Sequence, residues 1–383
     1  MFKIHTLNKI SAQGLSVFPK DKYALDAELK DADAVILRSA DMHELNYDEL
    51  RNLKSVARAG AGVNNIPIPV CTEHGIVVFN TPGANANAVA ELVILSMLAS
   101  ARPIVKGVAW AKTLIGNGEE VPKLVEKGKG QFVGPEIKGK KLGIIGLGAI
   151  GAIVANDAAA LGMSLVGYDP FLSEEGAKRL PAGIEIVKDL KDIFTSCDYI
   201  TMHIPQTPET KNTICADTIA LMKDGVRILN FSRGGLVNSA DMIAALDSGK
   251  VASYITDFGD EALLKAENAI CLPHLGASTP EAEENCAFMA VNQTINFLER
   301  GDILNSVNFP KCSLPVGHAA QRFTVTALKN AELAAQIAKA ISGITAIAVQ
   351  TRGDVSYAIV EVSSAIDPAA IAGIDGLVSI RIL

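Results

Sequence analysis

The sequence lacks any uninterrupted apolar run of about 18 residues, which is the length that a membrane-spanning helix needs. Hydrophobic residues nevertheless make up 49% of the chain. Gly, Ala and charged residues interrupt the apolar stretches, as Glu91 does within residues 88–102. The pattern argues against a membrane protein and favours buried parallel strands with Ala-rich packed helices.

The sequence also lacks paired cysteines, an apolar leader and an excess of basic residues. Its six cysteines form no Cys-x-x-Cys pair and no His–Cys spacing typical of a metal site. The first residues, MFKIHTLNKI, contain no apolar signal-peptide core. We therefore expect a reducing, cytoplasmic environment and no bound metal. A net charge of −7 with scattered Lys and Arg argues against nucleic acid as the main partner.

Residues 141–170 have the pattern of a dinucleotide-binding unit. An apolar run of strand length is followed by three glycines at G-x-G-x-x-G spacing, Gly146, Gly148 and Gly151. Glycines at these positions let the chain turn tightly, let the backbone approach a pyrophosphate and let the next helix pack closely. We expect that helix over residues 149–161, with its unpaired N-terminal amides directed at the phosphates.

Asp169 indicates which dinucleotide this unit binds. It ends a second apolar strand, expected over residues 164–168, and lies 23 positions after Gly146. Dinucleotide-binding units place there the carboxylate that accepts hydrogen bonds from the adenosine ribose. The same carboxylate would repel a 2′-phosphate, and no Arg follows at once. The sequence therefore predicts NAD rather than NADP as the cofactor.

Strand and helix patterns alternate on both sides of this unit. Further strands are expected over residues 2–7, 34–37, 56–58, 76–79, 184–187, 199–204, 227–230 and 253–257. This alternation predicts an α/β protein with a doubly wound parallel (Rossmann) cofactor domain and a second α/β substrate domain. After a linker with two prolines, the β-α-β-β-α-β order predicts a ferredoxin-like module.

The expected domain boundaries follow from these elements. The substrate domain takes residues 1–88 and is completed by a return helix within residues 278–310. The cofactor domain takes residues 89–277, and the linker and module take residues 311–383. The connector 112–140, rich in Gly and Lys, gives no assignable pattern.

Polar residues follow several of the expected strands, at the sheet edge where parallel sheets bind ligands. Arg38 and Arg58 follow two strands of the first domain and are candidates for holding an anionic substrate. Arg233 and His274 follow strands of the cofactor domain. Oxidation of a 2-hydroxy acid needs a cation that clamps the carboxylate and a base that takes the hydroxyl proton, which Arg and His supply. A neighbouring carboxylate would stabilise the protonated imidazole.

The motifs GLGAIG…YDP, HIPQTPET, NFSRGGLV, TDF and PHLGAST together resemble the D-isomer-specific 2-hydroxyacid dehydrogenase family. The resemblance covers nearly the whole chain and includes an ACT-like C-terminal module. It implies that Arg233 binds the substrate carboxylate, that His274 is the catalytic acid/base, and that Asp257 contacts the nicotinamide carboxamide. It also implies further cofactor contacts from Ala149, Ile150, Pro205, Phe231, Gly276 and Ala277.

The segments LRSADM, VARAGAGVNNIP and NTPGANANAVAEL extend the resemblance to family members with a phosphate-bearing substrate. The residues that would hold this substrate are Arg38, Ser39, Arg58 and Asn85. We also expect a homo-oligomer, a dimer or a tetramer.

The family's catalytic Glu lies five residues after the position that matches Asp257, and that position is Ala262 here. Asp260 and Glu261 are the first acids after Asp257. Because Glu261 has the longer side chain, we predict that it partners His274, with Asp260 as the alternative. For the whole chain, the alternatives are a glyoxylate or hydroxypyruvate reductase on the same scaffold and a non-catalytic, NAD-sensing corepressor-like protein.

Overall fold

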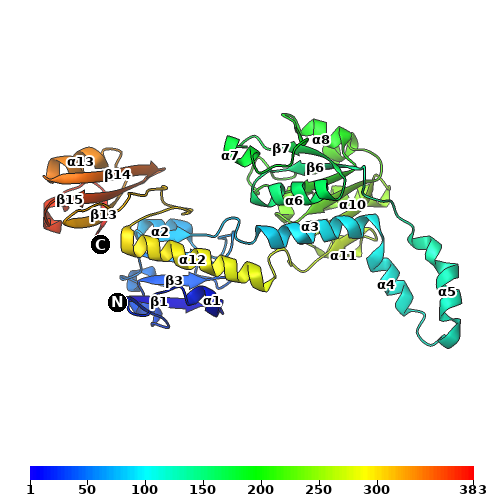
Figure 1. Cartoon of the computed structure of the whole chain (residues 1–383), viewed down its shortest axis with the longest axis horizontal. Coiled ribbons are helices and arrows are strands. Elements are labelled where there is room, and N and C mark those ends of the chain that lie inside the picture. The colour runs from blue at the N-terminus through cyan, green and yellow to red at the C-terminus, as the bar shows by residue number, and fades with distance from the viewer. The chain divides into compact units, whose positions relative to one another are not determined.

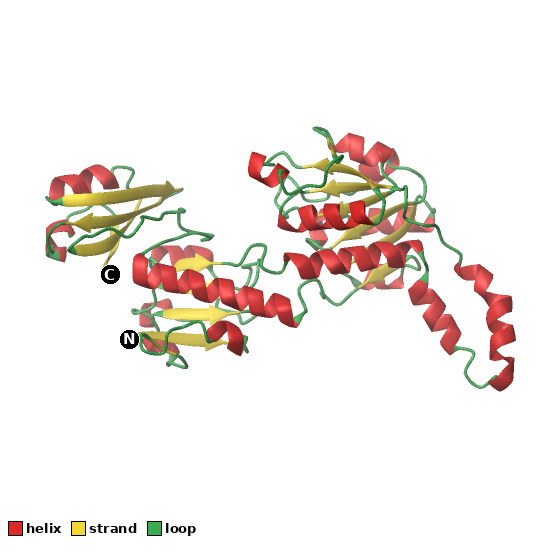
Figure 2. Cartoon of the chain, in the orientation of Figure 1, coloured by secondary structure: helices red, strands yellow, loops and turns green.

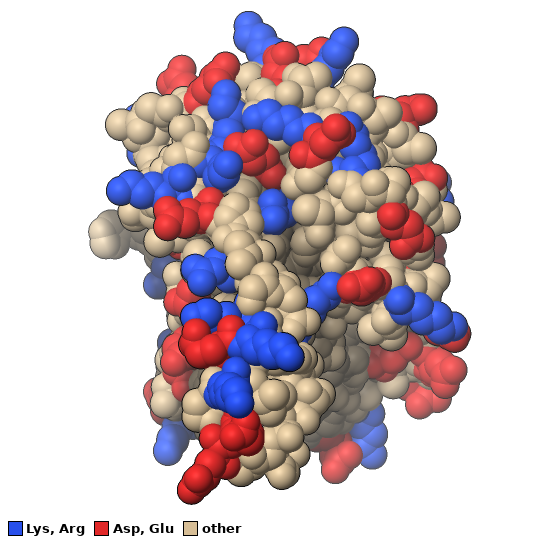
Figure 3. Space-filling model, turned by 90° about the vertical axis from the view of Figure 1, so that its right-hand side faces the viewer, with Lys and Arg blue, Asp and Glu red and all other residues tan.

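The computed structural model describes residues 1–383, which divide into two compact units (Figure 1). One unit contains residues 86–278, and the other contains residues 1–85 together with residues 279–383. In each, strands are layered with helices, as Figure 2 shows. Basic and acidic side chains are interspersed on the face drawn in Figure 3, with no extended area of one sign.

A seven-stranded parallel sheet forms the centre of residues 86–278, in the order β12-β11-β10-β9-β6-β7-β8. The strand order reverses at β6, which creates the topological switch point where doubly wound sheets bind ligands. This topology confirms the predicted Rossmann-type domain. The strands are β6 (Lys141–Ile145), β7 (Ser164–Tyr168), β8 (Glu185–Ile186), β9 (Tyr199–Met202), β10 (Val226–Asn230), β11 (Val251–Thr256) and β12 (Ala269–Cys271).

Alanine-rich helices pack closely on this sheet. In α6 (Ala149–Ala160), the residues Val154, Ala155 and Ala158 are completely buried against β6 and against α3 (Ala86–Ala101). Small side chains allow this close approach, and they contribute to the high apolar content of the chain. The remaining helices of the sheet are α7 (Glu174–Ala177), α8 (Leu190–Ser196), α9 (Ala216–Leu221), α10 (Ser239–Asp247) and α11 (Glu261–Lys265).

The connector that the sequence left unassigned is helical. It contains the end of α4 (Ile104–Lys112) and all of α5 (Val121–Gly128), and Trp110 of α4 packs against Phe132 with ring centroids 5.3 Å apart. No single helix of the chain has the length and apolarity to cross a membrane, and α3 and α4 meet that test only as a pair bent by 66°.

A second parallel sheet, in the order β2-β1-β3-β4-β5, lies in the other unit. Its strands are β1 (Phe2–Leu7), β2 (Tyr23–Ala24), β3 (Ala34–Leu37), β4 (Ser55–Arg58) and β5 (Val77–Phe79), and its helices are α1 (Ala12–Leu15), α2 (Ile68–Glu73) and α12 (Pro280–Arg300). The return helix α12 begins where the Thr279 hydroxyl accepts the Ala282 amide and ends at Gly301, which has a φ of 76°. It supplies buried residues to the core of this sheet.

The C-terminal module, residues 321–383, is a four-stranded antiparallel sheet in the order β14-β15-β13-β16. The order confirms the ferredoxin-like, ACT-like prediction, with a 3-10 turn at Pro368–Ile371 in place of the second helix. Its elements are β13 (Gln321–Leu328), α13 (Leu333–Ala340), β14 (Ile344–Arg352), β15 (Val355–Val362) and β16 (Leu377–Ile382).

Candidate active site

The turn between β6 and α6 requires glycine at two of its three glycine positions. Gly146 has a φ of 95°, and a Cβ there would lie 2.6 Å from the His203 carbonyl oxygen. A Cβ on Gly151 would collide with the Gly146 carbonyl oxygen. Around Gly148 nothing lies within 4 Å of an added Cβ, and no side chain caps the amides that begin α6. Uncapped amides beside open space fit the pyrophosphate of a dinucleotide.

Asp169 is fixed at this turn by the backbone. Its Oδ2 accepts the Leu147 amide and its Oδ1 accepts the Phe171 amide, both at 2.9 Å. Each carboxylate oxygen keeps a second lone pair. The side chain can therefore still accept hydrogen bonds from ribose hydroxyls.

His203 is a feature of this site that the sequence analysis did not single out. Its amide donates to Ile145 O at 2.7 Å, and its Nε2 lies 3.1 Å from the Thr201 hydroxyl. Burial lowers the pKa of His203 to about 3, so the ring is neutral, and its buried Nδ1 has no partner. Its only sequence signal is its position in the HIPQTPET motif, from which only Pro205 was predicted as a cofactor contact.

The other expected cofactor residues occupy several kinds of position. Ala149 and Ile150 begin α6, and the Pro205 carbonyl accepts the Thr210 hydroxyl at 2.7 Å. Phe231 is buried in the core with Leu229 of β10. Direct contact between these residues and the cofactor stays a prediction.

Phe258 lies next to both the loop that carries Arg233 and the His274 ring. The Asn230 side-chain amide donates to the Arg233 carbonyl at 2.9 Å and fixes the loop after β10. A Cβ on Gly234 would be 3.1 Å from the Phe258 Cβ, and the Phe258 ring packs edge-on against His274 at 5.0 Å between centroids. The structure therefore brings the loop of Arg233 and the ring of His274 to one edge of the sheet.

Asp257 holds the backbone that follows His274. The carboxylate is 5% exposed and accepts the amides of Leu275 at 3.0 Å and Gly276 at 2.7 Å. His274 itself has a φ of 56°, a left-handed conformation that an L-residue adopts only when its surroundings impose it. Such conformations cluster at functional sites. Contact of Asp257 with the nicotinamide, and of Gly276 and Ala277 with the cofactor, stays a prediction.

The two candidate acids after Asp257 have other partners in the structure. Asp260 is the N-cap of α11 and accepts the Leu263 amide at 2.8 Å, and this hydrogen bond contributes most to holding its pKa below the usual range. Glu261 is the first residue of α11, is 85% exposed and pairs with Lys265 at 2.6 Å. The structure does not join either acid to His274, and the assignment of Glu261 stays a prediction.

Three of the expected substrate residues, Arg38, Ser39 and Arg58, lie at the carboxyl ends of β3 and β4. Arg58 Nε donates to the Arg38 carbonyl at 2.9 Å, so the two arginines are neighbours. Arg38 Nη1 forms an ion pair with Glu283 of α12 at 2.5 Å. The Ser39 amide donates to the Asn8 side chain at 3.1 Å. Asn85 directly precedes α3. Their contact with a substrate stays a prediction.

The glycine turn, the carboxylate at the end of β7 and the switch point of the sheet define a dinucleotide-binding protein. Comparison with known proteins gives the family. Residues 94–276 match the D-isomer specific 2-hydroxyacid dehydrogenase, NAD binding domain. These residues form an NAD-binding domain of the D-isomer-specific 2-hydroxyacid dehydrogenase family, as the motifs suggested, and the cofactor is NAD.

Several relatives are named for one activity. The chain is 36% identical over 359 residues to the D-3-phosphoglycerate dehydrogenase of Synechocystis sp., which is 91% of this chain and 60% of that protein. It is 38% identical over 297 residues to the D-3-phosphoglycerate dehydrogenase of Methanocaldococcus jannaschii, which is 76% of this chain and 54% of that protein. The chain thus spans little more than half the length of these relatives.

A solved structure is similar as well. The NAD⁺-bound 3-phosphoglycerate dehydrogenase of Entamoeba histolytica superimposes with a TM-score of 0.63 and 28% sequence identity. The superposition covers 80% of this chain and 98% of that chain.

Proposed function

We propose that this protein is an NAD-dependent D-3-phosphoglycerate dehydrogenase. It oxidises D-3-phosphoglycerate to 3-phosphohydroxypyruvate, the first step of L-serine biosynthesis. The observation that carries the proposal is the pair of neighbouring arginines, Arg38 and Arg58, at the carboxyl ends of two adjacent strands. Two guanidinium groups suit a substrate with a phosphate group. The names of the relatives at 36–38% identity support the same substrate.

The proposed chemistry divides the work among three residues. Arg233 binds the substrate carboxylate, which fixes the carbon that is oxidised. His274 takes the proton of the 2-hydroxyl group. Asp257 positions the His274 loop through the two amides that follow it. NAD, when bound, accepts the hydride.

The ion pair between Arg38 and Glu283 is compatible with phosphate binding. Both side chains are substantially exposed, at 38% and 46%. Exposed ion pairs contribute about 0–1 kcal/mol, so a phosphate dianion can compete for the guanidinium. The pair uses Nη1 of Arg38, while a guanidinium carries five donors in all. Glu283 thus holds the side chain in place without blocking it.

The same ion pair also gives the alternative function its support. Because Glu283 already neutralises Arg38, a small unphosphorylated acid would leave that pair intact. A glyoxylate or hydroxypyruvate reductase on this scaffold would have such a substrate. Arg233 and His274 count against the remaining alternative, a non-catalytic corepressor-like protein.

One assay distinguishes these functions. NADH formation is measured side by side with D-3-phosphoglycerate, D-glycerate and D-lactate, with His274→Asn as the inactive control. We expect the highest kcat/KM with D-3-phosphoglycerate. An equal or higher value with D-glycerate would favour the reductase, and NAD binding without turnover of any of the three acids would favour the corepressor-like protein.

We also propose that the chain forms a homo-oligomer. Three apolar side chains of α4, Ile104, Val105 and Val108, are each more than half exposed. Exposed apolar side chains clustered on one short helix are typical of an interaction surface. Light scattering coupled to size-exclusion chromatography measures the mass directly. A monomeric mass at micromolar concentration would contradict this proposal.

A further inference from the structure

A cavity of about 290 Å³ lies where the C-terminal module meets the turn before β4. We call it the module cavity. Its walls come from three parts of one unit: the turn Arg51–Lys54 with His74 and Gly75, Phe297 of α12, and strands β13, β15 and β16 of the module. The fit between these walls is close, because a Cβ on Gly75 would lie 2.8 Å from Val378 of β16.

Arg381 of β16 has an unused hydrogen-bond donor in this wall. Its guanidinium lies 4.1 Å above the Phe297 ring, and its Nη2 donates to the Phe297 carbonyl. Its Nη1 is buried and has no hydrogen-bond partner. A buried, charged donor without an acceptor is unfavourable and rare, so its position beside a cavity calls for an acceptor there.

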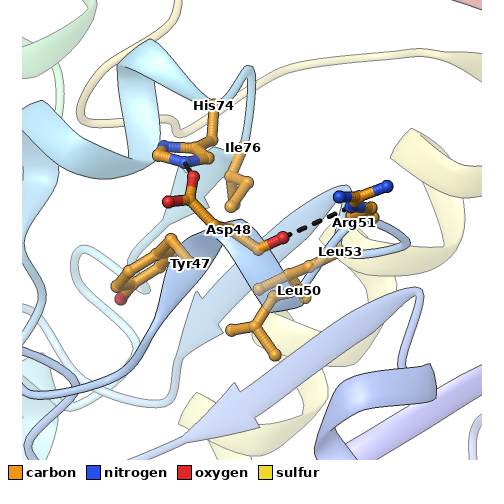
Figure 4. A pocket seen from close by; sticks show the side chains of 7 residues that line it. All are labelled: Tyr47, Asp48, Leu50, Arg51, Leu53, His74 and Ile76. Carbon is orange, nitrogen blue, oxygen red and sulfur yellow. Dashed lines mark hydrogen bonds and ion pairs between the residues drawn. The ribbon is translucent and has the colours of Figure 1, made fainter.

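Arg51 adds a second guanidinium without an acidic partner. Its Nε makes one long hydrogen bond, 3.4 Å, to the Asp48 carbonyl, and it forms no ion pair. Figure 4 shows its guanidinium pointing away from His74 and out of the neighbouring hollow around Tyr47. In the same view, the Asp48 carboxylate is turned toward His74, with which it pairs at 3.2 Å.

The carboxylates near the module cavity are already engaged. Asp33 pairs with Lys54 at 2.5 Å and accepts the Lys3 amide at 2.7 Å. Lys54 is thereby neutralised. Neither Arg51 nor Arg381 forms an ion pair. The Asp33 carboxylate and the Tyr357 side chain act electrostatically on Arg381, but Asp33 is shared with Lys54 and Tyr357 is neutral.

We propose that the module cavity binds a small oxyanion, a phosphate or carboxylate compound, between Arg51 and Arg381. A guanidinium matches the geometry of either group. Hydroxyl groups of the lining residues Thr326 and Ser379 add donors, and Phe297 and Val378 suit a short apolar part. The volume of the module cavity is near the lower end of the range that is typical for ligand sites. The bound compound is therefore limited to the size of a small metabolite.

This site is distinct from the proposed substrate site. Arg51 and Lys54 precede β4, whereas Arg58 lies at the opposite, carboxyl end of that strand. The module cavity therefore opens at the other edge of the sheet. Because its walls belong to both the sheet and the module, a bound anion would hold these two parts together.

Isothermal titration calorimetry on the full chain tests the proposal, with inorganic phosphate and succinate as separate probes. Arg51→Gln should weaken binding by about tenfold to a hundredfold, because a charge-assisted contact is lost. Arg51 is exposed, so the variant should fold. Lys339→Gln on α13, outside the cavity, is the matched charge control and should bind as the wild type does. Binding of only one probe identifies the oxyanion as phosphate or carboxylate.

Arg38→Ala separates this site from the substrate site, which could also take phosphate. Binding that persists in Arg38→Ala and is lost in Arg51→Gln supports the module cavity. Two outcomes would overturn the proposal: neither probe binds at millimolar concentration, or binding is lost in Arg38→Ala and unchanged in Arg51→Gln.

Discussion

Arg322 ties the C-terminal module to the segment that precedes it. Its Nη1 donates to Glu361 of β15 at 2.8 Å, and its Nη2 donates to the Leu314 carbonyl at 2.7 Å. Its Nε donates to the Arg300 carbonyl at 2.9 Å, and Asp302 lies 3.5 Å from Nη2. The side chains of Arg322 and Glu361 are only 9% and 4% exposed.

Replacing Arg322 with Met should strongly destabilise the module. The substitution preserves most of the apolar volume but leaves the buried Glu361 without its counter-ion. Removing one partner of a buried pair costs about 3–5 kcal/mol. At 1.36 kcal/mol per factor of ten, amide protection in the module should fall by roughly two to four powers of ten. The double variant Arg322→Met/Glu361→Leu should recover part of this loss, because Glu361 no longer remains as an unpaired buried charge, while Asp302, whose side chain is 16% exposed, still loses its partner.

Native-state hydrogen exchange, followed by mass spectrometry of peptides from β13 and β15, measures this effect locally. Arg352→Met is the matched control, because Arg352 is an exposed arginine of the same module that only donates to backbone carbonyls. The single tryptophan, Trp110, reports separately on residues 86–278, whose unfolding should not change. Protection within about tenfold of the wild type in Arg322→Met would refute the reasoning, since it would mean a cost of at most about 1.4 kcal/mol.

The same pair makes the stability of the module depend on pH. The Gly317 amide, and then Arg322, hold the pKa of Glu361 below its usual range. A carboxyl group with a depressed folded pKa stabilises the fold above its unfolded pKa, and this contribution is lost as the pH falls through the depressed value. Acid should therefore lower protection of β13 and β15 in the wild type. Glu361→Gln should show a smaller fall, and an equal fall in both proteins would contradict this assignment.

Three further predictions concern the proposed catalytic function. NAD should give at least about tenfold higher kcat/KM than NADP, because Asp169 both accepts ribose hydroxyls and repels a 2′-phosphate; equal values with the two cofactors would contradict this. Arg38→Ala should lower kcat/KM for D-3-phosphoglycerate by roughly tenfold to a hundredfold, and an equal loss with D-glycerate would show that Arg38 is not a phosphate ligand. Glu261→Gln should reduce kcat by roughly tenfold to a hundredfold and shift the pH–rate profile toward acid, if Glu261 partners His274. A large loss in Asp260→Asn alone would assign that role to Asp260.

The elements that the sequence predicted most accurately are those whose pattern of apolar and glycine residues is complete within one short segment. The run from β6 to Asp169 contains its own strands, its glycine turn and its helix, so the local pattern was enough. The edge strand β8 was expected over residues 184–187 and contains only Glu185 and Ile186, both exposed, where burial imposes no pattern. The helices α4 and α5 were missed because exposed lysines and glycines obscure their apolar spacing.

The positions of side chains around His274 could not be read from the sequence. The length of its side chain favoured Glu261 as the partner of His274, but the local helix decides the direction of that side chain. Asp260 before a Glu-Ala-Leu-Leu-Lys segment is a helix-start signal, and it places Glu261 in the first turn, one turn from Lys265. The hydrogen bonds from the Leu275 and Gly276 amides to Asp257 likewise join two segments that meet only in the folded sheet.

The return helix α12 has a consequence for the order in which a growing chain can fold. Residues 1–85 emerge from the ribosome before residues 86–383, but the core of their sheet includes Ala290, Val291 and Phe297 of α12. That core cannot close until about residue 300 has been synthesised, whereas residues 86–278 contain their whole sheet by then. During synthesis, residues 86–278 can therefore fold before the unit that flanks them on both sides in the sequence. Until α12 has been synthesised, strands β1 to β5 keep apolar surface exposed.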